Sequence, residues 1–449
     1  MEKTNQAAPR GYFFVENLGC AKNQVDAESI VASLESQSWA RTESADTADM
    51  IIVNSCGFVE DARKESIDVT LSFRQLYPGK RIVLACCLTE LRGAQLAEIM
   101  PEIDGVFGNR APSRITEIVD DVLAGKRPVF LPEEYENTPQ GSPELSMKGS
   151  AYLKIAEGCD NRCSYCSIPL IRGGLRSRPA AAIVDDAARL IGSGVREINV
   201  IAQDLGSYGH DLGARSLPEL LRSILEIPGS YWLRLLYIHP DRFPMDILDI
   251  CKHDPRLLPY FDIPVQHGSA RILKLMGRSG DGTGYTALAQ HIREELPDAV
   301  LRSTFLIGFP GETRRDFGLL REFQDKAKFD WLGAFSYSRE EGTVAYGAGI
   351  LPAITHRIAR PSVKRRVDEV QSVQREISET MVKRFVGRTV DVLIEERIEG
   401  EELFLGRMYA QAPDVDGLVV VHGDDFAVGT FVKCRIIKAN GIDLEATAV

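Results

Sequence analysis

Apolar and polar positions alternate regularly along the first part of the chain. Short apolar runs typical of buried parallel strands occupy residues 12–15, 50–53 and 81–85. Between them, residues 26–36 and 62–76 carry apolar side chains at helical spacing. Because strands and helices alternate in this way, the pattern predicts a small α/β domain over residues 11–128.

The same alternation resumes after residue 150. Strand-like runs occupy residues 197–202, 232–238, 261–265, 301–307 and 331–337. Repeated β/α units of this length predict a partial, TIM-like (β/α) barrel. A charged helical stretch follows at 355–384 and is predicted to be a solvated connector. Barrel and connector together extend over residues 151–384. The active site of such a barrel lies at the carboxyl ends of its strands. We expect one site lined by the polar residues that follow these strands, namely Gln203, Asp204, His239, Asp241, Gln266, His267 and the stretch 308–313.

Two other regions have patterns of their own. Residues 129–150 hold prolines and glycines among few apolar residues, which predicts a linker. Residues 387–449 alternate β-type residues with turn sequences such as Asp416-Gly417 and Asn440-Gly441, which predicts a small all-β barrel.

Composition narrows the class of protein. A chain of 449 residues with 44% hydrophobic residues suits about two or three globular domains. It has no run of the roughly eighteen apolar residues that cross a bilayer, and residues 1–10 lack the apolar core of a signal peptide. We therefore expect a cytoplasmic protein without membrane contact, whose nine cysteines are thiols or metal ligands rather than disulfides. The net charge of −11 argues against a general nucleic-acid binder.

Three of these cysteines mark the start of the predicted barrel. Cys159, Cys163 and Cys166 have the spacing C-x3-C-x2-C, and Tyr165 precedes the last of them. Three thiolates can hold three irons of a cubane cluster and leave the fourth iron open to another ligand. The spacing resembles the signature of the radical S-adenosylmethionine (SAM) enzymes. This resemblance implies that the open iron binds SAM and that an electron from the cluster cleaves it to a 5'-deoxyadenosyl radical.

Two further roles for the three thiols remain open. A zinc site would need a second cysteine or histidine pair at a matching distance, but the next cysteine, Cys251, stands alone. Disulfides would require an exported protein, and no other feature of the sequence suggests export.

The α/β domain carries a second set of cysteines. Cys20, Cys56 and the pair Cys86-Cys87 each fall just after a predicted strand. Strand ends lie side by side in a parallel sheet, so these thiols can converge on one point. A single buried cysteine is commonly only a small apolar side chain. Three at equivalent strand ends favour a second cluster.

The whole layout resembles the methylthiotransferase family, which combines an N-terminal cluster domain, a radical SAM barrel and a terminal TRAM domain. The resemblance covers the chain from Gly11 to its end. The stretches that look like the RimO branch of this family, which modifies ribosomal protein uS12, are GCAKN at 19–23, AYLKIAEGC at 151–159, FDIPVQH at 261–267 and SREEGT at 338–343.

The resemblance implies a role for individual residues. Cys20, Cys56 and Cys87 would bind an auxiliary 4Fe-4S cluster, and Cys159, Cys163 and Cys166 the 4Fe-4S cluster that binds SAM. The family commonly has glycine where this chain has Cys86, while Leu88 matches, so Cys87 is the predicted ligand and Cys86 the alternative. We assign cofactor contacts to Tyr165, Gln203 and Asp204, although Ala202-Gln203-Asp204 replaces the Gly-Gly-Glu of many radical enzymes.

Charge in the last region bears on the substrate. Residues 387–449 contain twelve acidic and six basic residues. A module that grips RNA phosphates is expected to be basic, whereas an acidic module suits a basic protein partner. Most ribosomal proteins are basic, so the balance favours a protein substrate over tRNA.

The implied function is the addition of a methylthio group to the β-carbon of an aspartate in uS12, free or in the small ribosomal subunit. SAM would serve as methyl donor and as radical source, with an electron donor such as flavodoxin or ferredoxin. No acid–base catalytic residue is expected, because the carbon–hydrogen bond is too weakly acidic and the cofactor performs the difficult step. The alternatives are a tRNA methylthiotransferase acting on an adenosine derivative near the anticodon and, more distantly, a metal-stabilised binding protein without activity.

Overall fold

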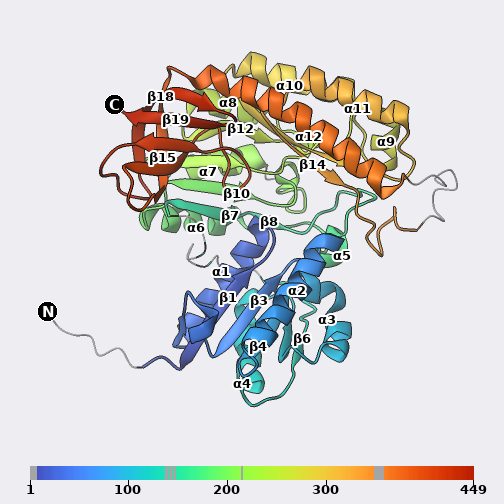
Figure 1. Cartoon of the computed structure of the whole chain (residues 1–449), viewed down its shortest axis with the longest axis vertical. Coiled ribbons are helices and arrows are strands. Elements are labelled where there is room, and N and C mark those ends of the chain that lie inside the picture. Colours follow the sequence, from blue (N-terminus) through green and yellow to red (C-terminus); the bar gives the residue numbers. More distant parts are fainter. Residues whose placement is uncertain (1–7, 137–140, 142–144, 146–147, 214–215, 348–357) are drawn as a thin grey trace. The chain divides into compact units, whose positions relative to one another are not determined.

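The computed structural model describes residues 8–136, 141, 145, 148–213, 216–347 and 358–449 (Figure 1). The chain divides into two compact units. The N-terminal unit comprises residues 1–145 together with Ser167–Gly174, and the larger unit comprises Ser146–Cys166 and Leu175–Val449. In the described part of the chain, no helix combines the length and apolar character needed to span a membrane.

The N-terminal unit is built on a parallel sheet of six strands in the order β2-β1-β3-β4-β5-β6. The strands are β1 Gly11–Asn17, β2 Trp39–Arg41, β3 Met50–Ser55, β4 Arg81–Cys86, β5 Gly105–Phe107 and β6 Val129–Phe130. The α-helices are α1 Ala21–Ser36, α2 Glu60–Leu76, α3 Cys87–Ile99, α4 Thr116–Leu123 and α5 Ile168–Arg172. Every residue of β3 is buried, as its continuous apolar run predicts for a strand covered on both faces. The predicted α/β domain is confirmed.

The larger unit contains a second parallel sheet of six strands, in the order β14-β13-β12-β11-β10-β7, which is the predicted partial barrel. Its strands are β7 Ser150–Lys154, β10 Glu197–Ile201, β11 Trp232–Leu235, β12 Leu257–Asp262, β13 Val300–Ile307 and β14 Trp331–Ser336. Its helices are α6 Ala180–Gly192, α7 Leu217–Leu225, α8 Asp246–His253, α9 Ala270–Leu275, α10 Gly282–Glu295 and α11 Arg314–Ala327. A small antiparallel pair, β8 Ala156–Glu157 and β9 Arg176–Ser177, flanks the cysteine loop in sequence.

One barrel strand differs from its prediction. β12 ends at Asp262, so the predicted strand at 261–265 lies largely beyond it. Pro264 has no N–H to donate to a strand ladder, which explains why the strand ends before it.

The terminal region forms a closed five-stranded barrel in the order β15-β16-β17-β19-β18, as predicted. Its strands are β15 Thr389–Arg397, β16 Leu403–Met408, β17 Val419–His422, β18 Phe431–Asn440 and β19 Asp443–Ala448.

The charged stretch before this barrel is more than a solvated connector, which corrects its prediction. It forms α12, Arg360–Val382, while residues 355–357 of the predicted helix lie outside the described residues. Val363, Val370, Gln374 and Ser378 recur at helical spacing and are buried. Gln374 Nε2 donates to the Phe329 carbonyl at 2.8 Å. This buried stripe packs α12 onto the partial barrel.

Two domain boundaries also move. β6 pairs with β5, so the first residues of the expected linker at 129–150 belong to the sheet of the N-terminal unit. Residues 137–140, 142–144 and 146–147 of that linker lie outside the described residues. Ser167–Gly174 belongs to the N-terminal unit although the cysteine motif before it belongs to the barrel. Ser167 Oγ donates to the Phe58 carbonyl at 3.2 Å and ties this segment to the loop after β3.

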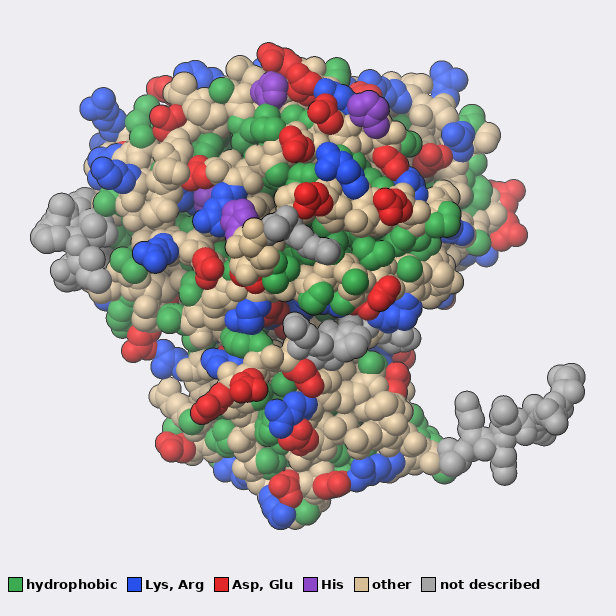
Figure 2. Space-filling model, turned by 180° about the vertical axis from the view of Figure 1, so that it is seen from behind, with side chains coloured by type: hydrophobic (Ala, Val, Ile, Leu, Met, Phe, Trp, Pro, Cys, Tyr) green, Lys and Arg blue, Asp and Glu red, His purple; other side chains and the backbone are tan. Residues whose placement is uncertain are grey.

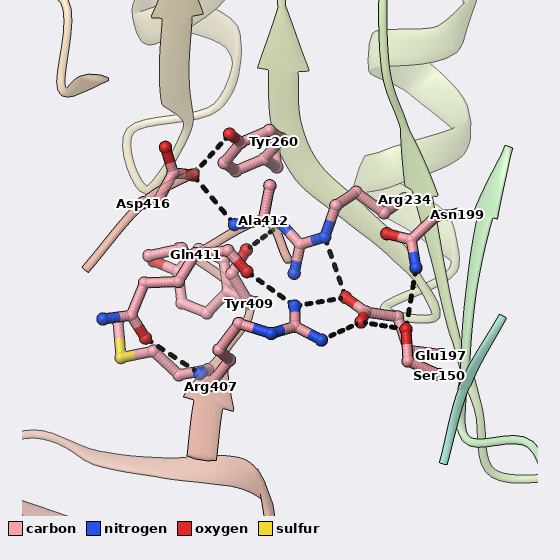
Figure 3. A network of polar contacts seen from close by, with 12 residues as sticks. Ser150, Glu197, Asn199, Arg234, Tyr260, Arg407, Tyr409, Gln411, Ala412 and Asp416 are labelled. Atoms are coloured by element: carbon pink, nitrogen blue, oxygen red, sulfur yellow. Dashed lines mark hydrogen bonds and ion pairs between the residues drawn. The ribbon is translucent and has the colours of Figure 1, made fainter. Parts of the chain in front are cut away.

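The terminal barrel docks on the amino ends of the partial-barrel strands (Figure 3). Arg407 reaches Glu197 at the start of β10, and the indole nitrogen of Trp331, at the start of β14, donates to the Ala410 carbonyl at 2.7 Å. The ring of Trp232, at the start of β11, lies 4.4 Å from that of Phe431. The opposite, carboxyl ends of the same strands carry the polar residues predicted to form the site.

Candidate active site

The cysteines predicted to bind the auxiliary cluster lie at the carboxyl ends of three adjacent strands. Cys20 follows β1 and is the N-cap of α1, Cys56 follows β3 directly, and Cys87 begins α3 immediately after β4. β1, β3 and β4 are neighbours in the sheet, so the three turns meet at one edge. The convergence predicted from the sequence is therefore present.

Asn23 connects these turns. Its Oδ1 lies 3.1 Å from Cys87 Sγ and 3.9 Å from Cys20 Sγ. Its Nδ2 donates to the Ser55 carbonyl at 2.9 Å, next to Cys56. Asn23 therefore contacts two of the thiols and the backbone next to the third. The sequence contained Asn23 in its GCAKN stretch but did not single it out.

Cys86 and Cys87 are separated by their surroundings. Cys86 lies in the hydrophobic core on one face of the sheet, together with Phe107 and Ile52. Cys87 instead lies among Asn23, Asn109 and Arg172. The φ angle of Cys86 is +74°, a region that glycine adopts without strain. The geometry favours Cys87 over Cys86 as the ligand.

The donor set fits a cluster. Burial raises the pKa of the Cys87 thiol to about 12, and the nearby Arg172 guanidinium opposes this rise. Burial also raises the pKa of Cys56. Buried thiols with such pKa values become thiolates only when positive charge compensates them, and cluster irons supply that charge. Within the described residues, no three His, Cys, Asp or Glu side chains could hold one metal ion together. A cubane bonds each thiolate to a different iron and does not need that geometry.

The second cysteine loop begins at Gly158, whose φ is +70°, and is fixed to the partial barrel. Ser164 donates through its backbone N–H to the Met276 carbonyl at 2.9 Å and through Oγ to the Leu275 carbonyl at 2.7 Å. The backbone N–H of Asn161 points at Cys159 Sγ, 3.4 Å away. Burial raises the pKa of Cys159 to about 11, so this thiol too becomes a thiolate only where positive charge such as that of cluster irons compensates it.

Tyr165 is held by a buried arginine that sequence reasoning missed. Arg278 Nη2 donates to the Tyr165 hydroxyl at 3.2 Å, and Nη1 donates to the Pro264 carbonyl at 2.7 Å. The ring of Tyr165 packs against the barrel core. These contacts anchor the aromatic residue between Cys163 and Cys166.

Gln203 and Asp204 follow β10 and have different surroundings. Gln203 Nε2 donates to Glu157 at 3.0 Å, while its buried Oε1 has no hydrogen-bond partner among the described residues. Asp204 Oδ2 accepts from Asn161 Nδ2 at 2.8 Å and from Ser207 at 2.6 Å. Its Oδ1 accepts from the N–H groups of Gly206 and His239, both at 3.0 Å. Because protein donors occupy both oxygens, Asp204 braces the cysteine loop, and Gln203 offers the free polar atom.

The next strand ends add two neutral histidines. Burial and the nearby Arg278 lower the pKa of His239 to about 4, although the carboxylates of Asp204 and Asp241 act in the opposite direction. Burial lowers the pKa of His267 to about 3. In His267, Nδ1 accepts from the Ser269 N–H at 2.9 Å, so Nε2 carries the proton and lies 3.9 Å from Glu312. Asp241 accepts instead from Ser279 and Tyr285, in the wall beside His239.

Comparison with known proteins finds matches to each of the three predicted domains. Residues 12–108 match an uncharacterized protein family, UPF0004, residues 153–323 the radical SAM superfamily, and residues 386–449 the TRAM domain. Ribosomal protein uS12 methylthiotransferase RimO of Treponema denticola is 40% identical over 96% of this chain and 99% of that protein. RimO of Symbiobacterium thermophilum is 42% identical over 96% of this chain and 90% of that protein. The chain belongs to the RimO family.

As a RimO-family protein it is a radical SAM methylthiotransferase that uses SAM and 4Fe-4S clusters. The fold agrees with solved radical SAM enzymes. The methyltransferase TsrM of Kitasatospora setae superposes with a TM-score of 0.54 at 15% identity, covering 76% of each chain. The RimO-family assignment thereby confirms the predicted family, fold and enzyme class.

Several acidic side chains of the terminal barrel are engaged in contacts within the protein. Glu395 and Asp416 are bound to Arg407 and Tyr260 in its docking face. Asp443 accepts from the Leu418 N–H at 2.9 Å. Acidic and basic side chains are interspersed on the face of the molecule shown in Figure 2. Some of the twelve acids therefore stabilise the fold rather than present charge to a partner.

Proposed function

We propose that this enzyme methylthiolates the β-carbon of an aspartate in ribosomal protein uS12. The observation that carries the proposal is the full-length similarity, at 37–42% identity, to proteins named as uS12 methylthiotransferases. The acidic balance of the terminal barrel supports a basic protein substrate over tRNA. We place the reaction in the cytoplasm, with a small reductant such as flavodoxin or ferredoxin as electron donor.

In this proposal Cys159, Cys163 and Cys166 hold the SAM-binding cluster, and Cys20, Cys56 and Cys87 hold the auxiliary cluster. When bound, the cofactors would supply a radical able to remove hydrogen from an unactivated carbon and a source of sulfur. The role of the protein is to position the cysteine ligands and the bound cofactor. Asp204 and Ser164 fix the loop that carries Cys159, Cys163 and Cys166. The buried Oε1 of Gln203 is available to a bound cofactor.

The neutral side chains around the barrel opening suit this chemistry. His239 and His267 carry no charge near neutral pH, because burial lowers the pKa of each well below 6.5. No proton transfer is required from either residue. The two histidines therefore line the strand ends as neutral polar groups.

The test is made in a strain that lacks its own uS12 methylthiotransferase. The chain is expressed there, and intact uS12 is weighed together with an analysis of tRNA nucleosides. We expect a methylthio mass gain on uS12 and unchanged tRNA. The Cys159→Ala and Cys87→Ala variants should abolish the gain, whereas Cys86→Gly should retain it. Modified tRNA with unmodified uS12 would establish the alternative substrate.

A further inference from the structure

A buried arginine touches the proposed auxiliary site from a distant part of the chain. Arg172 is the last residue of α5, and its side chain is 2% exposed. One nitrogen, Nη2, lies 3.1 Å from Cys87 Sγ, 2.7 Å from Asp26 Oδ2 and 3.0 Å from Asn23 Oδ1. Ser167–Gly174, which carries Arg172, belongs to the same unit as these three residues.

Two buried side chains fix the Arg172 guanidinium in place. Asp26, on α1, is 1% exposed, so the ion pair with Arg172 is entirely removed from water. Burying a charge is costly, and the pair persists only where geometry and further hydrogen bonds compensate. Asn23 supplies one such bond while its own Nδ2 is fixed by the Leu18 and Ser55 carbonyls. The guanidinium is thus held at a fixed place beside the sulfur of Cys87.

Cys87 also receives a second, neutral donor. Asn109 Nδ2 lies 3.7 Å from Cys87 Sγ. When Cys87 is a thiolate it can only accept, and Arg172 and Asn109 both donate. Hydrogen bonds to cluster sulfurs and nearby charge are the means by which a protein sets the reduction potential of an iron–sulfur cluster. The charged donor is also the nearer one.

We propose that Arg172 is a positioning residue that raises the reduction potential of the auxiliary cluster, with Asp26 limiting the effect. Reduction adds one negative charge to the cluster, and a buried cation beside its ligand sulfur stabilises that charge. The Asp26 carboxylate beside the cation opposes it. This inference rests on the proposed ligand set of Cys20, Cys56 and Cys87.

The two charges predict shifts of opposite sign. Arg172→Gln removes the cation and should lower the potential, with at least a tenfold change in the reduction equilibrium, about 59 mV for one electron. Asp26→Asn keeps the cation and removes its counterion, so the potential should rise. A merely structural disturbance of the buried pair would not shift the potential in opposite directions. Asn109→Leu, which removes the neutral donor, should lower the potential less than Arg172→Gln.

The measurement uses the full chain with Cys159, Cys163 and Cys166 replaced by alanine, so that only the auxiliary cluster remains. Dithionite titration with redox mediators, followed by electron paramagnetic resonance, gives the potential of each variant. Arg172→Gln with an unchanged potential overturns the inference and leaves the ligand set standing. If that variant does not retain its cluster, Asp26→Asn decides, and an unchanged or lower potential overturns the inference.

The ligand set has its own readout in the same experiment. Absence of any cluster in the parent chain without Cys159, Cys163 and Cys166, or its persistence after Cys87→Ala, would refute the auxiliary ligands and the role of Arg172 with them. Loss of the cluster in Cys87→Ala with retention in Cys86→Gly supports the ligand set independently of any potential.

Discussion

Arg407 of the terminal barrel and Glu197 at the start of β10 form a two-pronged ion pair that is closed to solvent. Arg407 Nη1 lies 3.2 Å from Glu197 Oε1, and Nη2 lies 2.5 Å from Oε2. The two side chains are 4% and 0% exposed. Arg234, equally buried, binds the same carboxylate at 2.8 Å. Burial alone would raise the pKa of Glu197, but Arg407 and Arg234 lower it to about 2. The terminal barrel is therefore locked to the amino ends of the barrel strands.

Removing Arg407 should weaken the attachment of the terminal barrel and destabilise the protein. Arg407→Leu leaves Glu197 buried with one cation in place of two, and Glu395 loses its partner as well. Breaking a buried pair costs about 3–5 kcal/mol, to be measured by anaerobic urea unfolding. The control is Lys433→Leu, which removes an exposed 3.7 Å pair with Asp391 in the same barrel. That change should stay within about 0.5 kcal/mol, and equal losses in the two variants would contradict the lock.

The conformation of Cys86 leads to a second prediction. Its φ of +74° strains any residue with a Cβ, by about 1–3 kcal/mol, whereas glycine adopts it freely. Cys86→Gly loses buried sulfur but relieves this strain, and Cys86→Ala loses the sulfur and keeps the strain. Cys86→Gly should therefore be more stable than Cys86→Ala by about 1 kcal/mol in chemical unfolding. The reverse order would show that packing of the sulfur outweighs the backbone.

Cys86 also illustrates how far the sequence reaches. The strand–helix alternation and the spacing of the thiols were enough to predict three domains and two groups of cysteines. The backbone angle that separates Cys86 from Cys87 depends on how β4 turns into α3, which no local pattern reveals. Arg172 and Arg278 were missed for a related reason. Their partners, Asp26 and Tyr165, are more than one hundred residues away in sequence, so only the fold brings them together.

Histidine burial gives the folded protein a dependence on pH. His267 has its pKa lowered by burial to about 3 against an ordinary value of 6.5, so folding favours its neutral form. The contribution of His267 to the free energy of unfolding is complete above pH 6.5 and decreases as the pH falls towards 3. When the pH is lowered from 7.5 to 5.5, the free energy of unfolding of the wild type should decrease by about 1.4 kcal/mol more than that of His267→Asn. Asparagine is chosen because its amide oxygen can still accept from Ser269.

This comparison is made by anaerobic urea unfolding at the two pH values. The neighbouring charges, Asp316, Glu312, Arg271 and Arg366, are common to both proteins and cancel in the difference. His253→Asn, at an exposed position on α8, is the matched control and should leave the pH dependence as in wild type. Parallel pH profiles for wild type and His267→Asn would show that the imidazole is solvated in the folded protein.

Asp204 should control the cysteine loop without touching the cluster itself. Its Oδ2 holds Asn161, between Cys159 and Cys163, and its Oδ1 holds the turn after β11. Removing such an outer contact from a metal site costs about 10- to 100-fold in metal affinity. In a chain with Cys20, Cys56 and Cys87 replaced by alanine, Asp204→Ala should therefore lose iron to a chelator at least tenfold faster than its parent. Asp249→Ala, an exposed acid on α8, should lose iron at the parental rate. Equal rates for all three proteins would mean that the thiolates alone fix the loop.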